Sequence, residues 1–342
     1  MSQDAVNVGL IGTGRIGRLH AQHLSHRIDQ AKLMMVSDIS EESACQCADQ
    51  CGVDQVSTDY RTILDNPDIQ AVVICSSTDT HADLIVAAAE HGKQIFCEKP
   101  VDHDLEEIDR ALLAVERAGS LLQIGFNRRF DSNVSRVRNA VSSGEIGTPH
   151  LLHIVSRDPS PPPLEYIKNS GGLFMDMTIH DFDMARFLLG QEVEEIYATG
   201  SVRVDPAIGE AGDLDTALIV LKFSEGAVGT IDNSRQAVYG YDQRVEVFGS
   251  GGCVEGGNRF PNEVTVLTKD SVTRDLPHHF FLERYQESYL EEMKQFVDAV
   301  RSGNSSPMSG QEARIPVVMG KAALKSHLEN RPVRLEEIDS AS

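Results

Sequence analysis

Near its amino end the chain reads Val6-Asn7-Val8-Gly9-Leu10-Ile11-Gly12-Thr13-Gly14-Arg15-Ile16-Gly17, an apolar segment followed by the pattern G-x-G-x-x-G. The apolar residues predict a buried strand, and the segment after Gly14 predicts a helix that ends near His26. In this setting Gly12 permits a tight turn, Gly14 lets a pyrophosphate approach the backbone, and Gly17 allows the helix to pack closely on the strand. A turn without a ligand is the alternative, but the strand–turn–helix context favours a dinucleotide site.

An acidic residue, Asp38, stands where the second strand is expected to end, 21 residues after Gly17. Its carboxylate would accept hydrogen bonds from the ribose hydroxyls of adenosine and would repel a 2′-phosphate, so we expect NAD rather than NADP as the cofactor. The expected cofactor contacts lie in the glycine turn and in the loops that follow the strands. They are Gly12, Gly14, Arg15, Ile16, Gly17, Asp38, Ile39, Ser76, Thr78, His81, Glu98 and Lys99. His81 could instead form a local hydrogen bond where its helix begins.

The first part of the chain alternates short apolar strands with helices. Strands are expected at residues 6–11, 33–37, 71–75, 94–97 and 121–124, and helices at 41–51, 80–91 and 105–118. This alternation is typical of an α/β Rossmann fold, a doubly wound parallel sheet covered on both faces, which we assign to residues 1–126.

After about residue 130 the pattern changes to successive strands with few helices. Helices are expected at 132–143 and 176–189, and strands at 150–156, 193–204, 215–223, 227–236, 243–249, 252–255 and 263–268. We predict an α+β substrate-binding and oligomerisation domain over residues 127–283, with a large, open, mostly antiparallel sheet. Leu218 and Val220 make the second face of one strand apolar as well, which suggests that a partner subunit covers it. Helices at 284–302 and 310–330 close the chain within a segment 284–342.

Composition excludes several classes of partner. The net charge of −21 argues against nucleic acid and against anionic membrane surfaces, and no run of residues is apolar enough to span a membrane. Residues 1–4 leave no room for a secretory signal before the first strand, and six cysteines form no secreted framework, so we expect a cytoplasmic protein. Cys45, Cys47 and Cys51 lack a fourth ligand, so we predict no metal there.

Two further motifs carry residues suited to hydride-transfer chemistry. Lys99, in Glu98-Lys99-Pro100, follows a predicted buried strand at the edge where doubly wound sheets bind ligands. Asp176 and His180 are four residues apart, so a helix would place them on one face, and Asp183 would continue that face. A lysine, an aspartate and a histidine together can take the proton of an alcohol while its carbon gives up a hydride. A surface lysine, a structural helix and an Asp-His-Asp metal site are the alternatives, and we predict no metal.

With these motifs together, the chain resembles the glucose-fructose oxidoreductase/inositol dehydrogenase/rhizopine-catabolism (Gfo/Idh/MocA) family over essentially its whole length. The segments Gly125-Phe126-Asn127-Arg128-Arg129-Phe130-Asp131 and Tyr239-Gly240-Tyr241-Asp242-Gln243-Arg244-Val245-Glu246-Val247-Phe248-Gly249 resemble the inositol 2-dehydrogenase branch. The resemblance implies that Lys99, Asp176 and His180 are catalytic and that these three, with Arg128, Asp158 and Tyr241, contact the substrate. It also implies a homotetramer built through the open sheet face, and closing helices that pack back toward the nucleotide domain.

The activity implied is hydride transfer from C2 of myo-inositol to NAD⁺, giving 2-keto-myo-inositol, with His180 as base, Lys99 stabilising the oxygen and Asp176 positioning both. The alternatives are the same chemistry on scyllo-inositol, D-chiro-inositol or an aldose such as glucose, a non-catalytic NAD and sugar sensor, and an NAD-dependent glycosidase. Asp158 stands where some members carry Asn, which leaves the preferred stereoisomer open. Arg128 could instead pair with a surface acid, and either Tyr239 or Tyr241 could face the substrate.

Overall fold

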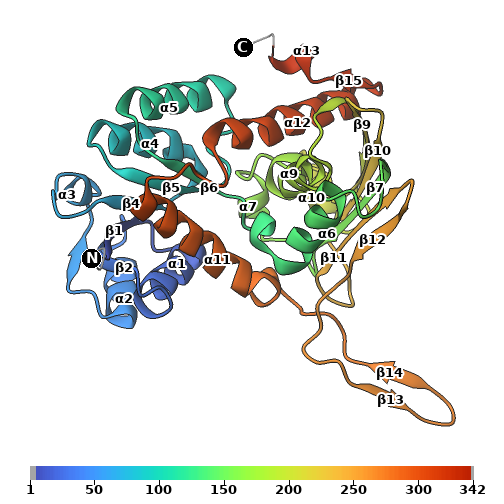
Figure 1. The fold of residues 1–342 in the computed structure, drawn as a ribbon, viewed down its shortest axis with the longest axis horizontal. Helices are drawn as coiled ribbons and strands as arrows, with labels where there is room; N and C mark the ends of the chain where they lie inside the picture. Colours follow the sequence, from blue (N-terminus) through green and yellow to red (C-terminus); the bar gives the residue numbers. More distant parts are fainter. Residues whose placement is uncertain (1–4, 340–342) are drawn as a thin grey trace. The chain divides into compact units, whose positions relative to one another are not determined.

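A computed structural model describes residues 5–339 (Figure 1). Residues 1–4, where we expect no secretory signal, and residues 340–342 lie outside the described residues. The chain divides into two compact units. Unit 1 contains the described residues up to Asn127 together with Glu287–Ile315, and unit 2 contains Arg128–Gln286 together with the described residues from Pro316 onward. The residues of the two closing helices are therefore divided between the units.

Unit 1 contains a parallel sheet. Its strands are β1 (Val6–Ile11), β2 (Ala31–Ser37), β3 (Gln55–Ser57), β4 (Ala71–Ile74), β5 (Gln94–Glu98) and β6 (Leu122–Gly125), in the order β3-β2-β1-β4-β5-β6. Every neighbouring pair in that order is parallel. The chain moves outward from β1 to one edge and then from β4 to the other, so the predicted doubly wound Rossmann sheet is confirmed. The short strand β3 was not predicted.

Helices cover both faces of this sheet. They are α1 (Arg15–His26), α2 (Glu41–Cys51), α3 (Arg61–Leu64), a 3₁₀ turn η1 (Thr78–Thr80), α4 (His81–Glu90) and α5 (Leu105–Ala118). Figure 1 shows α1 and α2 on one face and α4 and α5 on the other. The ends follow from local chemistry: the Asp104 side chain accepts a hydrogen bond from the Glu106 N–H where α5 begins, and Gly119 takes a left-handed φ of 64° where it ends.

The core of unit 1 joins the sheet to α11 (Phe281–Ser302), of which the part from Glu287 belongs to this unit. Phe96 and Phe296 are fully buried, with ring centroids 5.7 Å apart. Burial of each ring contributes about 2 kcal/mol. Cys47 and Cys51 of α2 pack in the same core.

Unit 2 is built around a mixed sheet of order β12-β11-β7-β10-β9-β8-β15. Its strands are β7 (Pro149–Arg157), β8 (Val193–Ser201), β9 (Thr216–Phe223), β10 (Val228–Ser234), β11 (Asp242–Gly249), β12 (Gly252–Gly256) and β15 (Val333–Arg334). β7 and β10 are parallel and the other neighbours are antiparallel, which confirms the predicted mostly antiparallel sheet. A separate hairpin, β13 (Thr265–Leu267) and β14 (Val272–Arg274), extends away from this sheet (Figure 1).

The helices of unit 2 differ in part from expectation. They are η2 (Asn127–Phe130, of which Asn127 belongs to unit 1), α6 (Ser132–Ser142), α7 (Leu164–Ile167), α8 (Leu173–Asp176), α9 (Thr178–Leu189), α10 (Pro206–Glu210), α12 (Gly310–Glu329, from Pro316) and α13 (Glu336–Asp339). The predicted helix 176–189 is wrong at its start, because α8 ends at Asp176 and α9 begins at Thr178. Thr178 Oγ1 lies within hydrogen-bonding distance of both the Leu173 carbonyl, at 3.3 Å, and Asn233 Oδ1, at 2.5 Å. These contacts disturb regular helix geometry.

The strand expected at 193–204 ends at Ser201, and α10 follows with Asp205 as its cap and Pro206 in its first turn.

Within residues 5–339 no helix combines the length and the apolar character that crossing a membrane requires.

Candidate functional site

The three glycines of the G-x-G-x-x-G turn in unit 1 have different surroundings. Gly12 has φ +92°, and a Cβ atom there would come within 2.6 Å of the Cys75 backbone. A Cβ at Gly17 would come within 2.0 Å of the Gly12 carbonyl oxygen, so only glycine allows α1 to begin so close to β1. At Gly14, by contrast, a Cβ would meet no heavy atom within 4 Å. The open space therefore lies at the second glycine, where the G-x-G-x-x-G pattern places the pyrophosphate.

The first turn of α1 adds the electrostatic part of this site. Gly14 caps α1 without a side chain, and Arg15 and Ile16 begin the helix. The N–H groups and the positive end of the helix dipole at this position favour an anion. The residues present therefore fit the pyrophosphate of a dinucleotide.

Asp38 follows β2 and is held by three hydrogen bonds. Its Oδ2 accepts from the Thr13 N–H (2.7 Å) and the Thr13 hydroxyl (3.0 Å), and its Oδ1 accepts from the Ser40 N–H (2.9 Å). A carboxylate has about four acceptor positions, so one remains for a ribose hydroxyl. Ile39 is 96% exposed and offers apolar surface beside Asp38. Thr13 was not predicted as a site residue, although its place inside the glycine motif was the available signal.

The loops after β4 and β5 are joined by His81. Its Nδ1 lies 2.8 Å from the Pro100 carbonyl oxygen and its Nε2 lies 3.1 Å from that of Ser76. Burial lowers the pKa of the His81 imidazole, so the ring is neutral near pH 7. The contact with Ser76 is local, five residues away in sequence, whereas the contact with Pro100 spans 19 residues. Ser76 Oγ lies 2.7 Å from the Thr80 hydroxyl, and Thr78 begins the 3₁₀ turn η1.

Glu98 and Lys99 stand at the carboxyl end of β5. Oε1 of Glu98 lies 2.8 Å from Nε2 of His20, a contact that the sequence did not indicate. Lys99 is half-buried, and the peptide bond between Lys99 and Pro100 is cis. Both residues belong to unit 1, at the sheet edge where open α/β sheets bind their ligands.

Asp176 belongs to unit 2, and two side chains hold its carboxylate. The Tyr166 hydroxyl donates to Oδ1 at 2.8 Å, and Arg235 Nη1 donates to Oδ2 at 3.0 Å. Arg235 is fully buried and also donates to Asp213 at 3.4 Å. These interactions orient Asp176 before any substrate binds. Sequence reasoning missed Tyr166 and Arg235; Arg235 fell inside the predicted strand 227–236, whereas the observed strand β10 ends at Ser234.

Arg128 pairs with a buried acid rather than a surface acid. Its Nη1 donates to Asp181 at 2.6 Å and its Nη2 donates to the Tyr241 hydroxyl at 3.3 Å. Burial raises the pKa of the Asp181 carboxyl, while Arg128 and a hydrogen bond from the Asn233 amide lower it. Neither Asp181 nor Asn233 was predicted.

Asp158 lies in the same electrostatic environment as Asp176 and Arg128. Burial, and then the Asp176 charge, raises the pKa of the Asp158 carboxyl to about 7, against the opposing effect of Arg235 and Arg128. This carboxyl group therefore changes charge near neutral pH. Unit 2 thus brings Arg128, Asp158 and Asp176 together among donors and acceptors suited to hydroxyl groups.

The two candidate tyrosines differ in their contacts. Tyr241 is buried against Arg128 and packs edge-on against Tyr285, with ring centroids 6.0 Å apart. Tyr239 is 37% exposed, and its hydroxyl donates to Asp242 at 2.7 Å. Of the two, only Tyr241 contacts a predicted substrate residue.

His180 is half-buried in the first turn of α9, in unit 2. Asp183, which would continue the row, is buried in a bidentate pair with Arg129, at 2.6 to 3.0 Å. Among the described residues, side chains with metal-ligand spacing form two other groups. They are His20, Glu98 and Glu292, and Glu246, Cys253 and Glu255.

Two family descriptions match the chain in succession. "Oxidoreductase family, NAD-binding Rossmann fold" matches residues 6–126, and "GFO/IDH/MocA C-terminal domain" matches residues 134–255. Myo-inositol 2-dehydrogenase of Thermotoga maritima is 49% identical over 97% of this chain and 99% of its own length. A scyllo-inositol 2-dehydrogenase (NAD(+)) of Bacillus subtilis is 38% identical over 97% of this chain and 96% of its own.

A solved structure also resembles the whole chain. Myo-inositol dehydrogenase from Lactobacillus casei, in complex with NAD(H) and myo-inositol, has a TM-score of 0.87 at 25% identity and covers 96% of each chain. The likeness thus runs through both the nucleotide-binding sheet and the mixed sheet. The chain belongs to the GFO/IDH/MocA family of NAD-binding oxidoreductases.

Proposed function

We propose that this protein oxidises myo-inositol at C2 to 2-keto-myo-inositol, with NAD⁺ as the hydride acceptor. The observation that carries the proposal is 49% identity to a myo-inositol 2-dehydrogenase over 99% of that relative's length. The chemistry of unit 2 supports it, because Arg128, Asp158 and Asp176 offer both donors and acceptors, as an uncharged ring of hydroxyl groups requires.

Each proposed site residue has a role that its chemistry allows. NAD, when bound, supplies the acceptor for the hydride. His180 takes the proton of the reacting hydroxyl, since an imidazole titrates near neutral pH. The Lys99 ammonium stabilises negative charge on the same oxygen, and Asp176, held by Arg235, orients the hydroxyl. Arg128, Asp158 and Tyr241 bind the remaining hydroxyl groups.

A substrate panel tests this activity. Purified protein with NAD⁺ is given myo-inositol, scyllo-inositol, D-chiro-inositol or glucose, and NADH is followed by its absorbance. We expect the highest kcat/KM with myo-inositol, and loss of NADH formation in H180Q but not in H26Q, which changes an exposed histidine on α1. If myo-inositol gives no NADH while another polyol is oxidised, that polyol replaces myo-inositol as the proposed substrate. Binding of NAD without turnover of any polyol would indicate a sensor.

Scyllo-inositol is the second candidate substrate, because the Bacillus subtilis relative is a scyllo-inositol 2-dehydrogenase. The two isomers differ only in whether the C2 hydroxyl is axial or equatorial. The ratio of their kcat/KM values separates the candidates directly.

We further propose that the protein is a homotetramer associated through the outer face of the mixed sheet. Phe248, Leu151 and Val228 occupy neighbouring positions on β11, β7 and β10, and each is at least 40% exposed. In the hairpin β13–β14 every strand residue is exposed, although an isolated hairpin is marginally stable in water. Both features favour cover by another subunit.

Light scattering with size-exclusion chromatography tests the assembly. We expect a mass of about 150 kDa, four times the 37.5 kDa chain, and a smaller species for F248D. The control L328D changes an exposed leucine of α12 and should stay tetrameric. A wild-type mass of one chain would contradict the proposed tetramer.

The described cysteines are all unpaired, which supports our proposal of a cytoplasmic setting.

A further inference from the structure

Polar groups from the glycine turn, the end of β2 and the start of α2 form a closed circuit around Asp38. Oδ1 of Asp38 accepts from the Ser40 N–H at 2.9 Å, and the Ser40 hydroxyl accepts from the Ser43 N–H at 3.3 Å. The Ser43 and Thr13 hydroxyl oxygens lie 2.8 Å apart, and the Thr13 hydroxyl closes the circuit at Oδ2 of Asp38, at 3.0 Å. The Asp38 carboxylate is therefore held through both of its oxygens.

Arg18 of α1 contacts this circuit from outside. Its Nε donates to the Thr13 carbonyl oxygen at 2.9 Å, and its Nη2 donates to Ser43 Oγ and to Gln46 Oε1, both at 3.1 Å. Within residues 5–339 its side-chain hydrogen bonds go to a carbonyl, a hydroxyl and an amide oxygen, and none goes to a carboxylate. In a chain with 52 acidic and 31 basic residues, Arg18 is thus bound to the hydroxyl groups that lead to Asp38 instead of to an acid of its own.

The direction of each hydrogen bond follows from the two ends of this chain of groups. A guanidinium only donates and a carboxylate only accepts, whereas each hydroxyl has one proton to give. The Thr13 hydroxyl donates to Asp38, so the Ser43 proton makes the 2.8 Å contact between the two hydroxyls, and the Thr13 carbonyl is farther from Ser43 Oγ, at 3.3 Å. The Ser43 oxygen in turn accepts from Arg18. Groups aligned in this way polarise one another, which strengthens the bond that reaches Asp38.

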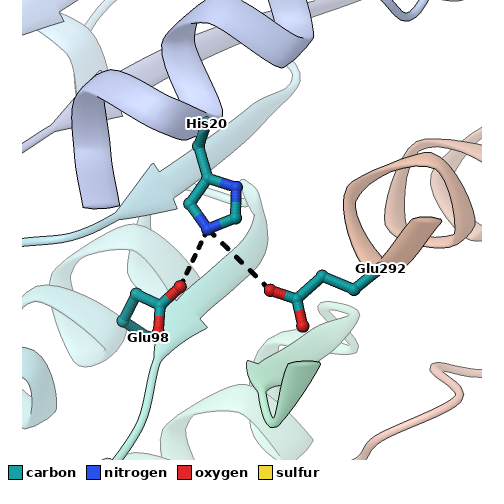
Figure 2. Close-up of side chains that lie close together, drawn as sticks. All are labelled: His20, Glu98 and Glu292. Atoms are coloured by element: carbon teal, nitrogen blue, oxygen red, sulfur yellow. Dashed lines mark hydrogen bonds and ion pairs between the residues drawn. The ribbon is translucent and has the colours of Figure 1, made fainter. Parts of the chain in front are cut away.

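α1 is held in place from its sheet-facing side. His20, two residues after Arg18, points toward β5, where its Nε2 lies 2.8 Å from Oε1 of Glu98 (Figure 2). The His20 ring also packs edge-on against Phe96 of β5, with ring centroids 5.1 Å apart. These contacts fix the rotation of α1 about its axis, so the Arg18 side chain stays against α2.

The circuit leaves Asp38 with capacity for one further donor. Three hydrogen bonds from within the protein occupy three of the roughly four acceptor positions of its carboxylate. A carboxylate that rotated freely would lose part of its binding energy in becoming ordered, whereas one that is already fixed loses little. The network therefore prepares Asp38 for the ribose hydroxyl before NAD binds.

We propose that Arg18 and Ser43 are positioning residues for NAD, which keep Asp38 in the orientation that binds the 2′-hydroxyl of the adenosine ribose. They act through the Thr13 hydroxyl and need no contact of their own with the cofactor. The inference rests on the expected contact between Asp38 and the ribose. It is independent of which polyol the protein oxidises.

A thermodynamic cycle with NAD⁺ and its 2′-deoxyadenosine analogue isolates this interaction. Dissociation constants are measured by calorimetric titration, with no polyol present. In the wild type we expect the analogue to bind about tenfold more weakly than NAD⁺, because it lacks the hydroxyl that donates to Asp38. In R18M, where the guanidinium is lost, this factor should fall below about threefold, because Asp38 is no longer held in one orientation.

Three further variants define the origin of the effect. R18K keeps the charge but not the forked donors, and S43A interrupts the relay by removing one hydroxyl, so both should give intermediate factors. R27M changes an arginine at the end of the same helix, which pairs with Glu287 at 3.5 Å, and should keep the wild-type factor. Melting temperatures establish that each variant is folded, and S43A carries the test if R18M is not.

A purely structural role for Arg18, as a brace between α1 and α2, would weaken the binding of both cofactors equally. An unchanged factor in folded R18M and S43A would therefore overturn the proposal. A wild-type factor near one would also overturn it, because Asp38 would then not bind the 2′-hydroxyl. Oxidation of a polyol other than myo-inositol would change the proposed substrate and leave these binding constants unaffected.

Discussion

Arg235 donates a hydrogen bond from Nη1 to Oδ2 of Asp176 across 3.0 Å, from a side chain that is fully buried. The guanidinium also donates a hydrogen bond to Asp213, at 3.4 Å, so it binds two carboxylates at once. This hydrogen bond therefore orients the Asp176 carboxylate.

Removal of this guanidinium should damage both stability and turnover. In R235M two carboxylates lose their buried partner, which costs about 3 kcal/mol of unfolding free energy. We expect kcat to fall about a hundredfold because the Asp176 carboxylate keeps the Tyr166 hydroxyl at Oδ1 but loses the donor that fixes Oδ2. R235K keeps the charge but not the two-armed geometry, so its kcat should be intermediate. R136Q, at an exposed arginine paired with Glu145, is the control. Steady-state kinetics and thermal melts measure both effects, and equal kcat in R235M and R136Q would contradict this role.

The three motif glycines should respond differently to alanine. A Cβ at position 17 meets backbone at 2.0 Å, so G17A should lower the melting temperature, whereas a Cβ at position 14 meets nothing within 4 Å. G14A should therefore keep the wild-type melting temperature, while its methyl group occupies space needed by the pyrophosphate. We expect its KM for NAD to rise about tenfold, equivalent to a loss of about 1.4 kcal/mol. An unchanged KM in G14A would place the pyrophosphate elsewhere.

Asp38 should determine the choice between NAD and NADP. Its carboxylate is fixed by Thr13 and Ser40, so its charge stays where a 2′-phosphate would bind. D38S removes the repulsion between the Asp38 carboxylate and the 2′-phosphate of NADP. We expect the ratio of kcat/KM for NAD to that for NADP to fall at least about tenfold. D54S, which changes an exposed aspartate, serves as the control. If D38S kept the wild-type ratio, cofactor choice would depend on another residue.

The nucleotide-binding unit could be predicted from sequence because its signals are local. The glycine turn, the strand before it and Asp38 lie within 33 residues, from Val6 to Asp38, and each has its own chemical reason. β3 and β15 were missed because they contain only three and two residues. Such short strands exist through pairing with β2 and β8, and their own side chains carry too little periodicity to be recognised.

The partners of the predicted residues in unit 2 depend on register between distant strands. Asn233 lies opposite Ser156 on β7 and Ala217 on β9, and this pairing brings its amide to Asp181. Arg235 reaches Asp176 across 59 residues of sequence. No local pattern marks either residue. The break between α8 and α9 also depends on a contact between residues far apart in sequence, because the Thr178 hydroxyl interacts with Asn233.

Tyr241 and Tyr239 offer a matched comparison. Y241F removes the hydroxyl that accepts from Arg128, at 3.3 Å, whereas Y239F removes one that contacts Asp242. We expect Y241F to raise KM for the polyol about fivefold, equivalent to about 1 kcal/mol. Y239F should leave KM within twofold. Kinetics with saturating NAD⁺ measure both constants, and a larger effect in Y239F would reverse the assignment of the two tyrosines.

Asp158 should make stability depend on pH. Its pKa in the folded protein is about 7, against an ordinary value of 3.8. Between those values the native state keeps a proton that the unfolded chain has lost, so this residue lowers stability as pH rises from about 4 to about 7. D158N keeps the shape of the side chain and cannot ionise. The melting temperature of D158N minus that of the wild type should therefore increase from pH 5 to pH 8.

The exposed aspartate variant D54N provides the reference for that measurement, because its difference from the wild type should not change with pH. A constant difference for D158N as well would mean that Asp158 is already ionised at pH 5. In that case the Arg128 and Arg235 charges, which lower the pKa of Asp158, would outweigh its burial. Asp158 would then accept hydrogen bonds from the substrate at every pH of the assay, and kcat/KM would show no limb near pH 7 from this group.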